Sequence, residues 1–186
     1  YSSSKACAEL VTQAYWDSFL VGQKGNLVGL ATARAGNVIG GGDTSAYRLI
    51  PDIMRAINSN IELEVRNPES VRPWQHVLDP LSGYLLLCEN LFNNPKQFSG
   101  AWNFGPTREA MVPVRTVLDK VSSICGVEFS WRISMVEDNL HEAPTLKLDA
   151  SKARQQLDWQ PVWGLETSIR HTIEWYQAQM AGHNMV

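Results

Sequence analysis

The sequence predicts an α/β protein, because segments with helical spacing alternate with strand-like segments along its 186 residues. The clearest strand is Leu27–Ala33, a nearly continuous apolar run bounded by glycines, which is typical of a strand buried on both faces of a parallel sheet. The later strand-like segments are short, or they alternate between apolar and polar residues. A parallel sheet needs more than one inner strand, so we expect further strands to precede Tyr1.

Helices are predicted wherever apolar residues recur at helical spacing. Most of these segments begin at a capping residue or a proline, such as Asp79-Pro80, Pro113 and Asp149, or end at a glycine such as Gly22. The predicted helices, in chain order, cover residues 1–20, 49–57, 79–92, 113–126, 149–157 and 165–180.

The remaining strands are predicted between these helices. Residues 61–65 and 128–133 alternate between apolar and polar side chains, which predicts strands with one exposed face. Residues 101–104 read as a short strand that ends at Gly105-Pro106. A glycine-rich loop, Gly36–Gly42, follows the first strand.

Composition excludes several classes of protein. The net charge is −3, with 16 basic and 19 acidic residues, whereas nucleic-acid binders usually carry a basic excess. No apolar run is long enough to span a membrane, and we see no signal peptide. The three cysteines are widely spaced and odd in number, which predicts reduced, buried thiols and a cytoplasmic protein. The first residue is not Met, so we expect a processed form or a piece of something longer.

Tyr1 and Lys5 form the first candidate for chemistry. Residues at i and i+4 lie one turn apart on the same face of a helix. An ammonium close to a phenol favours the phenolate, so this tyrosine could exchange a proton near neutral pH. An ordinary amphipathic helix also produces this spacing, and both interpretations stay open.

Arginines are the second candidate. Five of them and no lysine lie between Gly25 and Pro95. The rigid guanidinium fork matches phosphate oxygens, so these side chains could bind a diphosphate ester. Arg55 lies at i+3 from Asp52 on a predicted helix and reads as a surface ion pair, whereas Arg34 could be structural or functional.

Several motifs in order resemble the C-terminal part of an extended short-chain dehydrogenase/reductase that acts on nucleotide sugars, and most closely the CDP-glucose 4,6-dehydratases. The resemblance covers Tyr1 to about Met180. The motifs are Tyr1 with Lys5, Arg34–Asp43 (Arg-Ala-Gly-Asn-Val-Ile-Gly-Gly-Gly-Asp), Arg48–Pro51, Arg72–Val77 (Arg-Pro-Trp-Gln-His-Val), Trp102–Pro106 (Trp-Asn-Phe-Gly-Pro) and Leu140–Ala143 (Leu-His-Glu-Ala).

The resemblance implies a role for each matching residue. Tyr1 would take the proton of the sugar C4 hydroxyl. Lys5 would lower the pKa of Tyr1 and bind the nicotinamide ribose of NAD. Asn37 would also contact NAD. The substrate ligands implied by the resemblance are Asn37, Arg48, Leu49, Arg66, Arg72, Asn103 and His141. A turn-forming asparagine and a surface-loop histidine are the alternatives for Asn37, Asn103 and His141. We expect no metal, because the histidines lack ligand spacing.

The resemblance also implies the fold and the reaction. We expect the C-terminal part of a Rossmann-like, doubly wound parallel sheet, with the N-terminal cofactor half absent, plus a small α/β substrate-binding domain. Residues 1–45 would form the last part of the NAD-binding domain, and part of the segment 74–106 would return to that domain. Residues 46–73 and 107–186 would form the substrate-binding domain, which would bind CDP-glucose or a related nucleotide sugar. Gly40–Gly42 lacks the spacing of the glycine-rich turn that receives the NAD pyrophosphate.

The family enzyme would form a 4-keto-6-deoxy sugar for O-antigen synthesis, and this chain alone is expected to be inactive. This chain would form a homodimer, or it would pair with the missing N-terminal cofactor half. A nucleotide-sugar epimerase, a fragment of another sugar dehydratase and a non-catalytic binding or assembly module remain alternatives.

Overall fold

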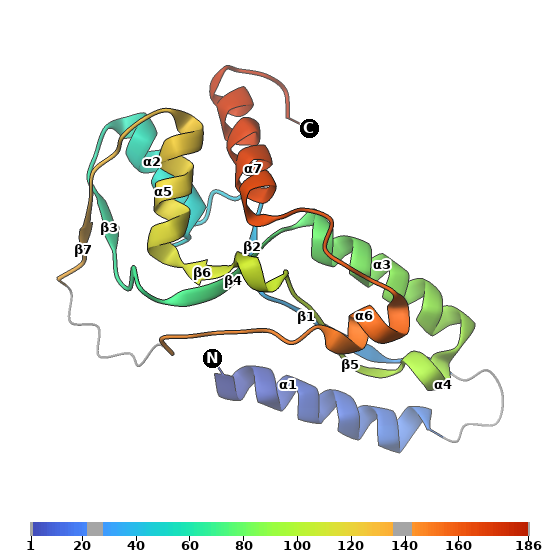
Figure 1. Cartoon of the computed structure of the whole chain (residues 1–186). Helices are drawn as coiled ribbons and strands as arrows, with labels where there is room; N and C mark the ends of the chain where they lie inside the picture. Colours follow the sequence, from blue (N-terminus) through green and yellow to red (C-terminus); the bar gives the residue numbers. More distant parts are fainter. Residues whose placement is uncertain (1, 22–27, 136–142, 186) are drawn as a thin grey trace. The chain divides into compact units, whose positions relative to one another are not determined.

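The structure is a computed structural model, and it describes residues 2–21, 28–135 and 143–185 (Figure 1). The chain forms two compact units. Unit 1 contains residues 1–35, 78–105 and 149–160, and unit 2 contains residues 36–77, 106–148 and 161–186. The functional assignment of the chain to a cofactor-binding part and a substrate-binding part stays a prediction.

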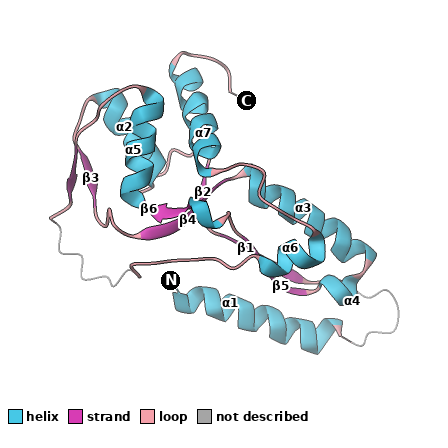
Figure 2. Ribbon diagram, in the orientation of Figure 1, coloured by secondary structure: helices cyan, strands magenta, loops and turns pink. Residues whose placement is uncertain are grey.

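Unit 1 is a pair of parallel strands covered by helices (Figure 2). The register places Thr32 opposite Ala101 and Arg34 opposite Asn103. In chain order its elements are α1 (Ser2–Tyr15), the π-helical turn Trp16–Leu20, β1 (Ala31–Ala35), α3 (Leu78–Asn93), α4 (Pro95–Phe98), β5 (Gly100–Phe104) and α6 (Ser151–Leu157).

The two faces of the β1–β5 pair have different partners. Side chains alternate along a strand, so Trp102 and Phe104 share one face and Ala101 and Asn103 the other. Trp102 and Phe104 are fully buried, in a core that α3, α4 and α6 complete. Thr32, on the face opposite Trp102, donates a hydrogen bond to Glu9 of α1 (2.8 Å). Helices therefore cover both faces of this strand pair.

Unit 2 contains two small sheets. One has the order β2–β4–β6, in which β4 is parallel to β2 and antiparallel to β6, and the other pairs β3 with β7 in parallel. Its elements are β2 (Asn37–Ile39), α2 (Leu49–Ser59), β3 (Leu63–Val65), β4 (Val71–His76), the 3₁₀ turn Arg108–Ala110, β6 (Met111–Pro113), α5 (Val114–Cys125), β7 (Trp131–Ile133) and α7 (Leu165–Met180).

The core of unit 2 joins three helices to the strands. Apolar residues at helical spacing on α2, α5 and α7 meet Ile39, Leu63, Val65 and Trp74. Side chains such as Ile53, Val117 and Ile169 are completely inaccessible to solvent. Burying a side chain of this size stabilises the fold by about 1.5–3 kcal/mol. The core therefore fixes the positions of α2 and α7, which hold the loop between β2 and α2.

The predicted α/β class is confirmed, and so are most helices. The last helix spans Leu165–Met180 as predicted. The first predicted strand is displaced: β1 begins at Ala31, and its residues are half-buried or exposed, so the prediction of a strand buried on both faces is wrong for this structure. Residues 22–27, which include Gly22, Gly25 and Leu27, lie outside the described part of the chain. Asp79 lies inside the first turn of α3, which begins at Leu78, so the prediction that it opens the helix is also wrong.

The strand β4 was not predicted, because Pro73 lies within it and proline cannot donate a hydrogen bond to a neighbouring strand. Its first half, Val71–Pro73, pairs with β6, and its second half, Trp74–His76, pairs with β2. Pro73 therefore stands where the pairing partner changes, a position that tolerates the missing donor.

The Gly40–Gly42 stretch is explained by close packing. A Cβ atom at Gly40 would lie 2.8 Å from Cγ1 of Val77, and one at Gly41 would lie 2.1 Å from Cγ of Trp175. Gly42 has a φ of +81°, which glycine adopts without steric cost. The three glycines allow the loop to leave β2 and run against α7, so they serve packing.

We predict that Gly41→Ala destabilises the protein by roughly 1–3 kcal/mol, the usual cost of overpacking a filled site. The added methyl group would overlap the Trp175 ring. Urea unfolding of the two proteins measures the difference. The same substitution in a Trp175→Ala background should cost much less, because the ring is gone; an equal cost in both backgrounds would contradict the steric explanation.

Candidate functional site

Asn37 and Arg72 lie on one face of the β2–β4–β6 sheet. Asn37 is directly opposite Trp74, and Arg72 is two residues before Trp74 on the same strand. Because side chains alternate along a strand, Arg72, Trp74 and Asn37 share a face. Arg72 is thus a diagonal neighbour of Asn37 on an adjacent, parallel strand. The structure thus brings together two of the predicted site residues.

Arg72 is unusual because it is a buried arginine, with 7% of its surface exposed. Charged side chains are almost never buried unless hydrogen bonds or ion pairs compensate them. Its Nη1 donates to the backbone carbonyl of Val71 (2.8 Å). The guanidinium takes part in further interactions as well, and these compensate its burial.

Arg48 and Leu49 begin α2. Arg48 is exposed at the N-cap position, with an extended backbone (φ −111°), and Leu49 is half-buried against the core of unit 2. The preceding residue, Tyr47, is 88% exposed and has a φ of +62°, which is uncommon for a residue other than glycine. Arg48 therefore presents its charge to solvent, whereas Leu49 anchors the first turn of the helix.

The loop before Arg48 is held by polar contacts. Arg55 donates hydrogen bonds to the carbonyls of Thr44 (3.1 Å) and Ser45 (3.0 Å), and it also pairs with Asp52. The surface ion pair predicted for Arg55 is confirmed, and the two loop contacts add to it. The carboxylate of Asp43 accepts a hydrogen bond from the backbone N–H of Ser45 (2.9 Å). Hydrogen bonds from Ser45 lower the pKa of Asp43, and the positive charges of Arg48 and Arg55 lower it further.

The other predicted site residues of unit 2 are Arg66 and His141. Arg66 directly follows β3 and is exposed. His141 lies outside the described residues. The roles implied for Arg66 and His141 stay predictions.

Asn103 and Lys5 belong to unit 1. The amide of Asn103 donates to the carbonyl of Asp149 (3.0 Å), and its Oδ1 is buried without a hydrogen-bond donor among the described residues. This contact ties β5 to the segment that opens α6. Lys5 is exposed in the first turn of α1. Tyr1 itself lies outside the described residues, so the proposed Tyr–Lys pair stays a prediction.

Lys152 and Arg34 place positive charge near β5 and β1. Lys152 donates to the carbonyl of Ala101 (3.0 Å), and its ammonium lies 3.9 Å from the centre of the Trp102 ring. Burial lowers the pKa of Lys152, and the charge of Arg34 lowers it further. Arg34 pairs with Glu9 of α1 (3.7 Å). These contacts join the strands to their helices, so they support a structural role for Arg34.

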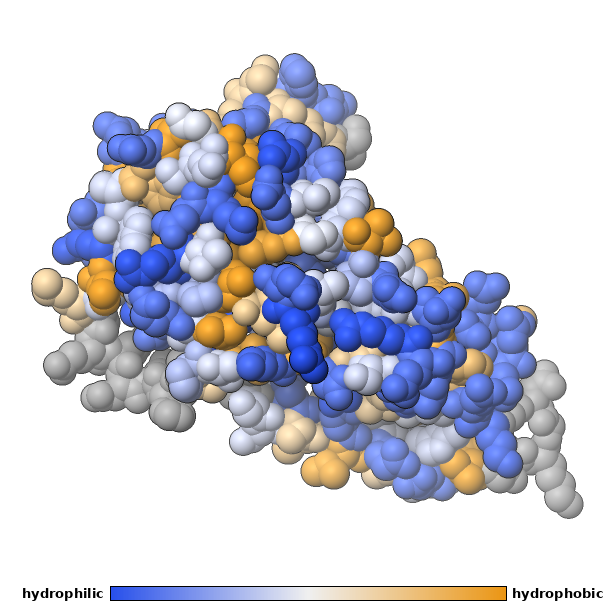
Figure 3. All heavy atoms as spheres, in the orientation of Figure 1, coloured by the Kyte–Doolittle hydropathy of each residue, from blue (hydrophilic) through white to orange (hydrophobic). Residues whose placement is uncertain are grey.

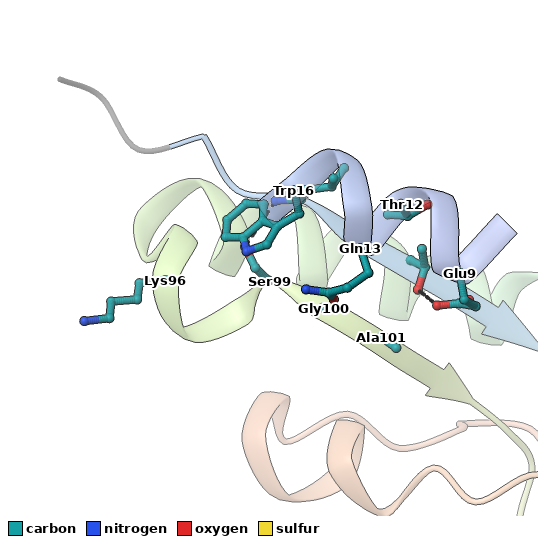
Figure 4. A pocket seen from close by; sticks show the side chains of 10 residues that line it. Glu9, Thr12, Gln13, Trp16, Lys96, Ser99, Gly100 and Ala101 are labelled. Carbon is teal, nitrogen blue, oxygen red and sulfur yellow. Dashed lines mark hydrogen bonds between the residues drawn. The ribbon is translucent and has the colours of Figure 1, made fainter. Parts of the chain in front are cut away.

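Unit 1 also contains an open cavity of about 290 Å³ between α1 and β5, shown in Figure 4. Glu9 and Gln13 of α1 and Trp16 of the following π-helical turn line it on one side, and Ser99 and Ala101 line it on the other. None of the site residues predicted from sequence is among its lining residues. The cavity therefore shares no residue with the site around Arg72.

Three further observations concern side chains outside these sites. Among the described residues, no group of three histidine, cysteine or acidic side chains could hold a metal ion. In the same part of the chain, no helix is both long and apolar enough to cross a membrane. The three cysteines are free, as predicted, but Cys7 and Cys88 are exposed and Cys125 is half-buried, so the prediction that they are buried is wrong for two of them.

The tryptophans near the C-terminus pack in both units. Trp163 packs against the rings of His76 and His171 in unit 2, with ring centroids 4.6 Å and 4.5 Å away. Trp159 packs against Phe104 in unit 1, and its Nε1 donates to Ser82 (3.1 Å). These tryptophans therefore pack within their own units, Trp159 in unit 1 and Trp163 in unit 2.

The family model described as "NAD dependent epimerase/dehydratase family" matches residues 1–105, more than half of the chain. The chain belongs to this family. The match confirms the family resemblance inferred from the motifs. It begins at the predicted Tyr–Lys pair and includes Arg48, Arg72 and Asn103.

A curated relative supports a narrower comparison. The CDP-glucose 4,6-dehydratase of Salmonella typhimurium is 46% identical over 188 residues, which cover all of this chain and 52% of that protein. This chain thus spans about half the length of the relative it matches.

Solved structures show the same fold at low sequence identity. A UDP-glucuronic acid 4-epimerase from Bacillus cereus has a TM-score of 0.79 at 14% identity, covering 95% of this chain and 52% of that chain. A dTDP-glucose 4,6-dehydratase from Bacillus anthracis, solved with NAD, has a TM-score of 0.73 at 19% identity, covering 98% and 53%. The predicted fold, part of a Rossmann-like α/β protein, is confirmed.

Proposed function

We propose that this chain is part of a CDP-glucose 4,6-dehydratase, which converts CDP-glucose to CDP-4-keto-6-deoxyglucose. The observation that carries the proposal is the 46% identity along the whole chain to a protein of that name. The geometry of Asn37 and Arg72 supports it, because a buried guanidinium beside an amide suits a diphosphate ester.

NAD is the proposed cofactor, and it would accept a hydride from the sugar and return it later. Lys5 is exposed on α1, a position that is compatible with the proposed role. Tyr1 would act as the base at the C4 hydroxyl, with a pKa lowered from about 10 by the ammonium one turn away. Asn37 would contact both cofactor and substrate.

The substrate would be held mainly by unit 2. Arg72 would bind the diphosphate, with Asn37 beside it. Arg48 and Arg66, both exposed, would bind other parts of the nucleotide, and the backbone at Leu49 would help to place it. Asn103 and His141 are proposed to be further substrate contacts. The product would enter the synthesis of 6-deoxy or dideoxy sugars for O-antigen, in the cytoplasm.

We predict that the protein at its full encoded length, supplied with NAD, forms a 4-keto product from CDP-glucose at a much higher kcat/KM than from UDP-glucose or dTDP-glucose. Detection of the 4-keto sugar by its ultraviolet absorbance in alkali measures the three rates. Conversion to a 4-epimer without loss of water would indicate an epimerase, and tight binding without turnover would indicate a binding module.

We predict that Arg72→Ala weakens CDP-glucose binding about 10- to 100-fold, because a hydrogen bond to a charged group contributes roughly 1.5–3 kcal/mol. NAD binding should be unchanged. Calorimetric titration with each ligand checks this, and thermal unfolding shows whether the variant is folded.

Two further variants serve as controls for Arg72. Arg72→Lys keeps the charge but loses the fork, so its affinity should be intermediate. Arg115→Ala removes an exposed arginine that pairs with Glu69 at the surface, and it should change neither affinity. Equal losses for NAD and CDP-glucose would count against a phosphate role.

The surface of unit 1 suggests a partner. Apolar side chains are exposed along α3 at a regular spacing of three to four residues: Leu78 (54% exposed), Leu81 (44%), Leu85 (74%) and Phe92 (87%), with Cys88 between the last two. Figure 3 shows hydrophobic residues among hydrophilic ones on one face of the molecule. Within the described residues β1 pairs only with β5, so one of its edges is open to another strand.

We therefore propose that α3 and β1 are covered either by a second copy or by the half that the curated relative has in addition. The chain of 186 residues on its own is predicted to self-associate. Light scattering during size-exclusion chromatography should give a mass above the 20.8 kDa of one chain. The Leu85→Glu variant should have a lower mass than the unmodified chain. Val162→Glu changes an exposed residue of unit 2 and should have no effect; a sharp monomer at all concentrations would contradict the proposal.

A further inference from the structure

The loop that ends at Arg48 is fixed to α7 at two neighbouring residues. The hydroxyl of Tyr176 donates a hydrogen bond to the backbone carbonyl of Asp43 (2.5 Å). Trp175 packs against Gly41 so closely that no Cβ atom would fit there. The two rings contact each other edge to face, with centroids 5.3 Å apart. The loop thus touches both rings of this pair.

The Tyr176 hydrogen bond is more than packing of a ring. Tyr176 is buried, with 6% of its surface exposed, and its ring belongs to the core of unit 2. A buried hydroxyl needs a partner, and the partner is a main-chain atom of the loop. A phenylalanine would fill the same space without holding the loop, so the hydroxyl has a separate role.

The contact can be followed from α7 to Arg48. Asp43 accepts two hydrogen bonds. Its backbone carbonyl accepts one from Tyr176, and its carboxylate accepts one from the backbone N–H of Ser45. Arg55 then holds the carbonyls of Thr44 and Ser45. Two residues later Tyr47 adopts a left-handed backbone, and Arg48 opens α2. The loop is therefore fixed at Gly41, Asp43 and Ser45, before the unusual turn that sets the direction of Arg48.

We propose that Tyr176, supported by Trp175, is a positioning residue for Arg48: its hydroxyl holds the loop in the conformation in which Arg48 binds the substrate. This rests on the proposed function, because the ligand of Arg48 is taken to be CDP-glucose. The C-terminal helix, which supplies none of the predicted substrate ligands, thereby contributes to substrate affinity.

The test compares Tyr176→Phe, Arg48→Ala and the double variant at the full encoded length. Tyr84→Phe is the matched control, because Tyr84 is a half-buried tyrosine of unit 1 that packs on Phe104. Hydrogen exchange reports the protection of the amides of residues 43–48, and it needs no ligand. Titration with CDP-glucose and with NAD reports affinity.

Tyr176→Phe should increase exchange in residues 43–48 and weaken CDP-glucose binding about 3- to 10-fold, with NAD binding unchanged. In the Arg48→Ala background the same change should weaken binding little further, because the two residues act through one contact. Tyr84→Phe should alter neither measurement.

Two results would overturn the proposal. The first is unchanged exchange in Tyr176→Phe, which would show that the hydroxyl does not hold the loop. The second is a loss of affinity that is as large in the Arg48→Ala background as in the wild type, since a general destabilisation would add to the loss of Arg48. If the wild type binds no CDP-glucose, the proposed function fails, and the substrate role of Tyr176 fails with it. Hydrogen exchange still shows in that case whether the Tyr176 hydroxyl holds the loop.

Discussion

The double pairing of β4 is the constraint on which the candidate site depends. One half of this strand pairs with β6 and the other half with β2, so its backbone is held on both sides. Such a strand can keep a guanidinium in an interior position that an exposed loop could not maintain, because the neighbouring strands fix the direction of each side chain. Arg72 and Asn37 share a face as a direct result of this register. The core contacts of Trp74 and Ile39 then attach the same face to the helices of unit 2.

Different parts of the chain were predictable to different degrees, for physical reasons. Helices such as Leu165–Met180 are local, so apolar spacing was enough to find them. β4 was missed because Pro73 conflicts with strand propensity, and only the arrangement of its two partners makes that position acceptable. β1 was placed too early because an apolar run was taken as evidence of burial, whereas the described sheet of unit 1 has only two strands.

The candidate site shows the same division. Arg72 was found from its residue type and its motif, and its burial agrees with a specialised role. The contacts of Tyr176 with Asp43 and of Trp175 with Gly41 connect residues more than 130 positions apart in the sequence. No local pattern reports a contact over such a distance, so the close packing at Gly41 became visible only in the structure. The loop against which Trp175 and Tyr176 pack likewise became visible only in the structure.

Unit 1 is assembled from three separate stretches of sequence, and this affects how the chain can fold. Its core needs Phe104 and Trp159 in contact, and Trp159 also binds Ser82, which lies 77 residues earlier. Contacts between distant residues form slowly, because a long loop must close before they stabilise anything. During synthesis, β1 and α3 leave the ribosome well before α6 exists to cover them. β1 and α3 therefore stay incompletely covered until α6 has been synthesised. During this interval a chaperone or a second nascent chain would encounter their exposed surface.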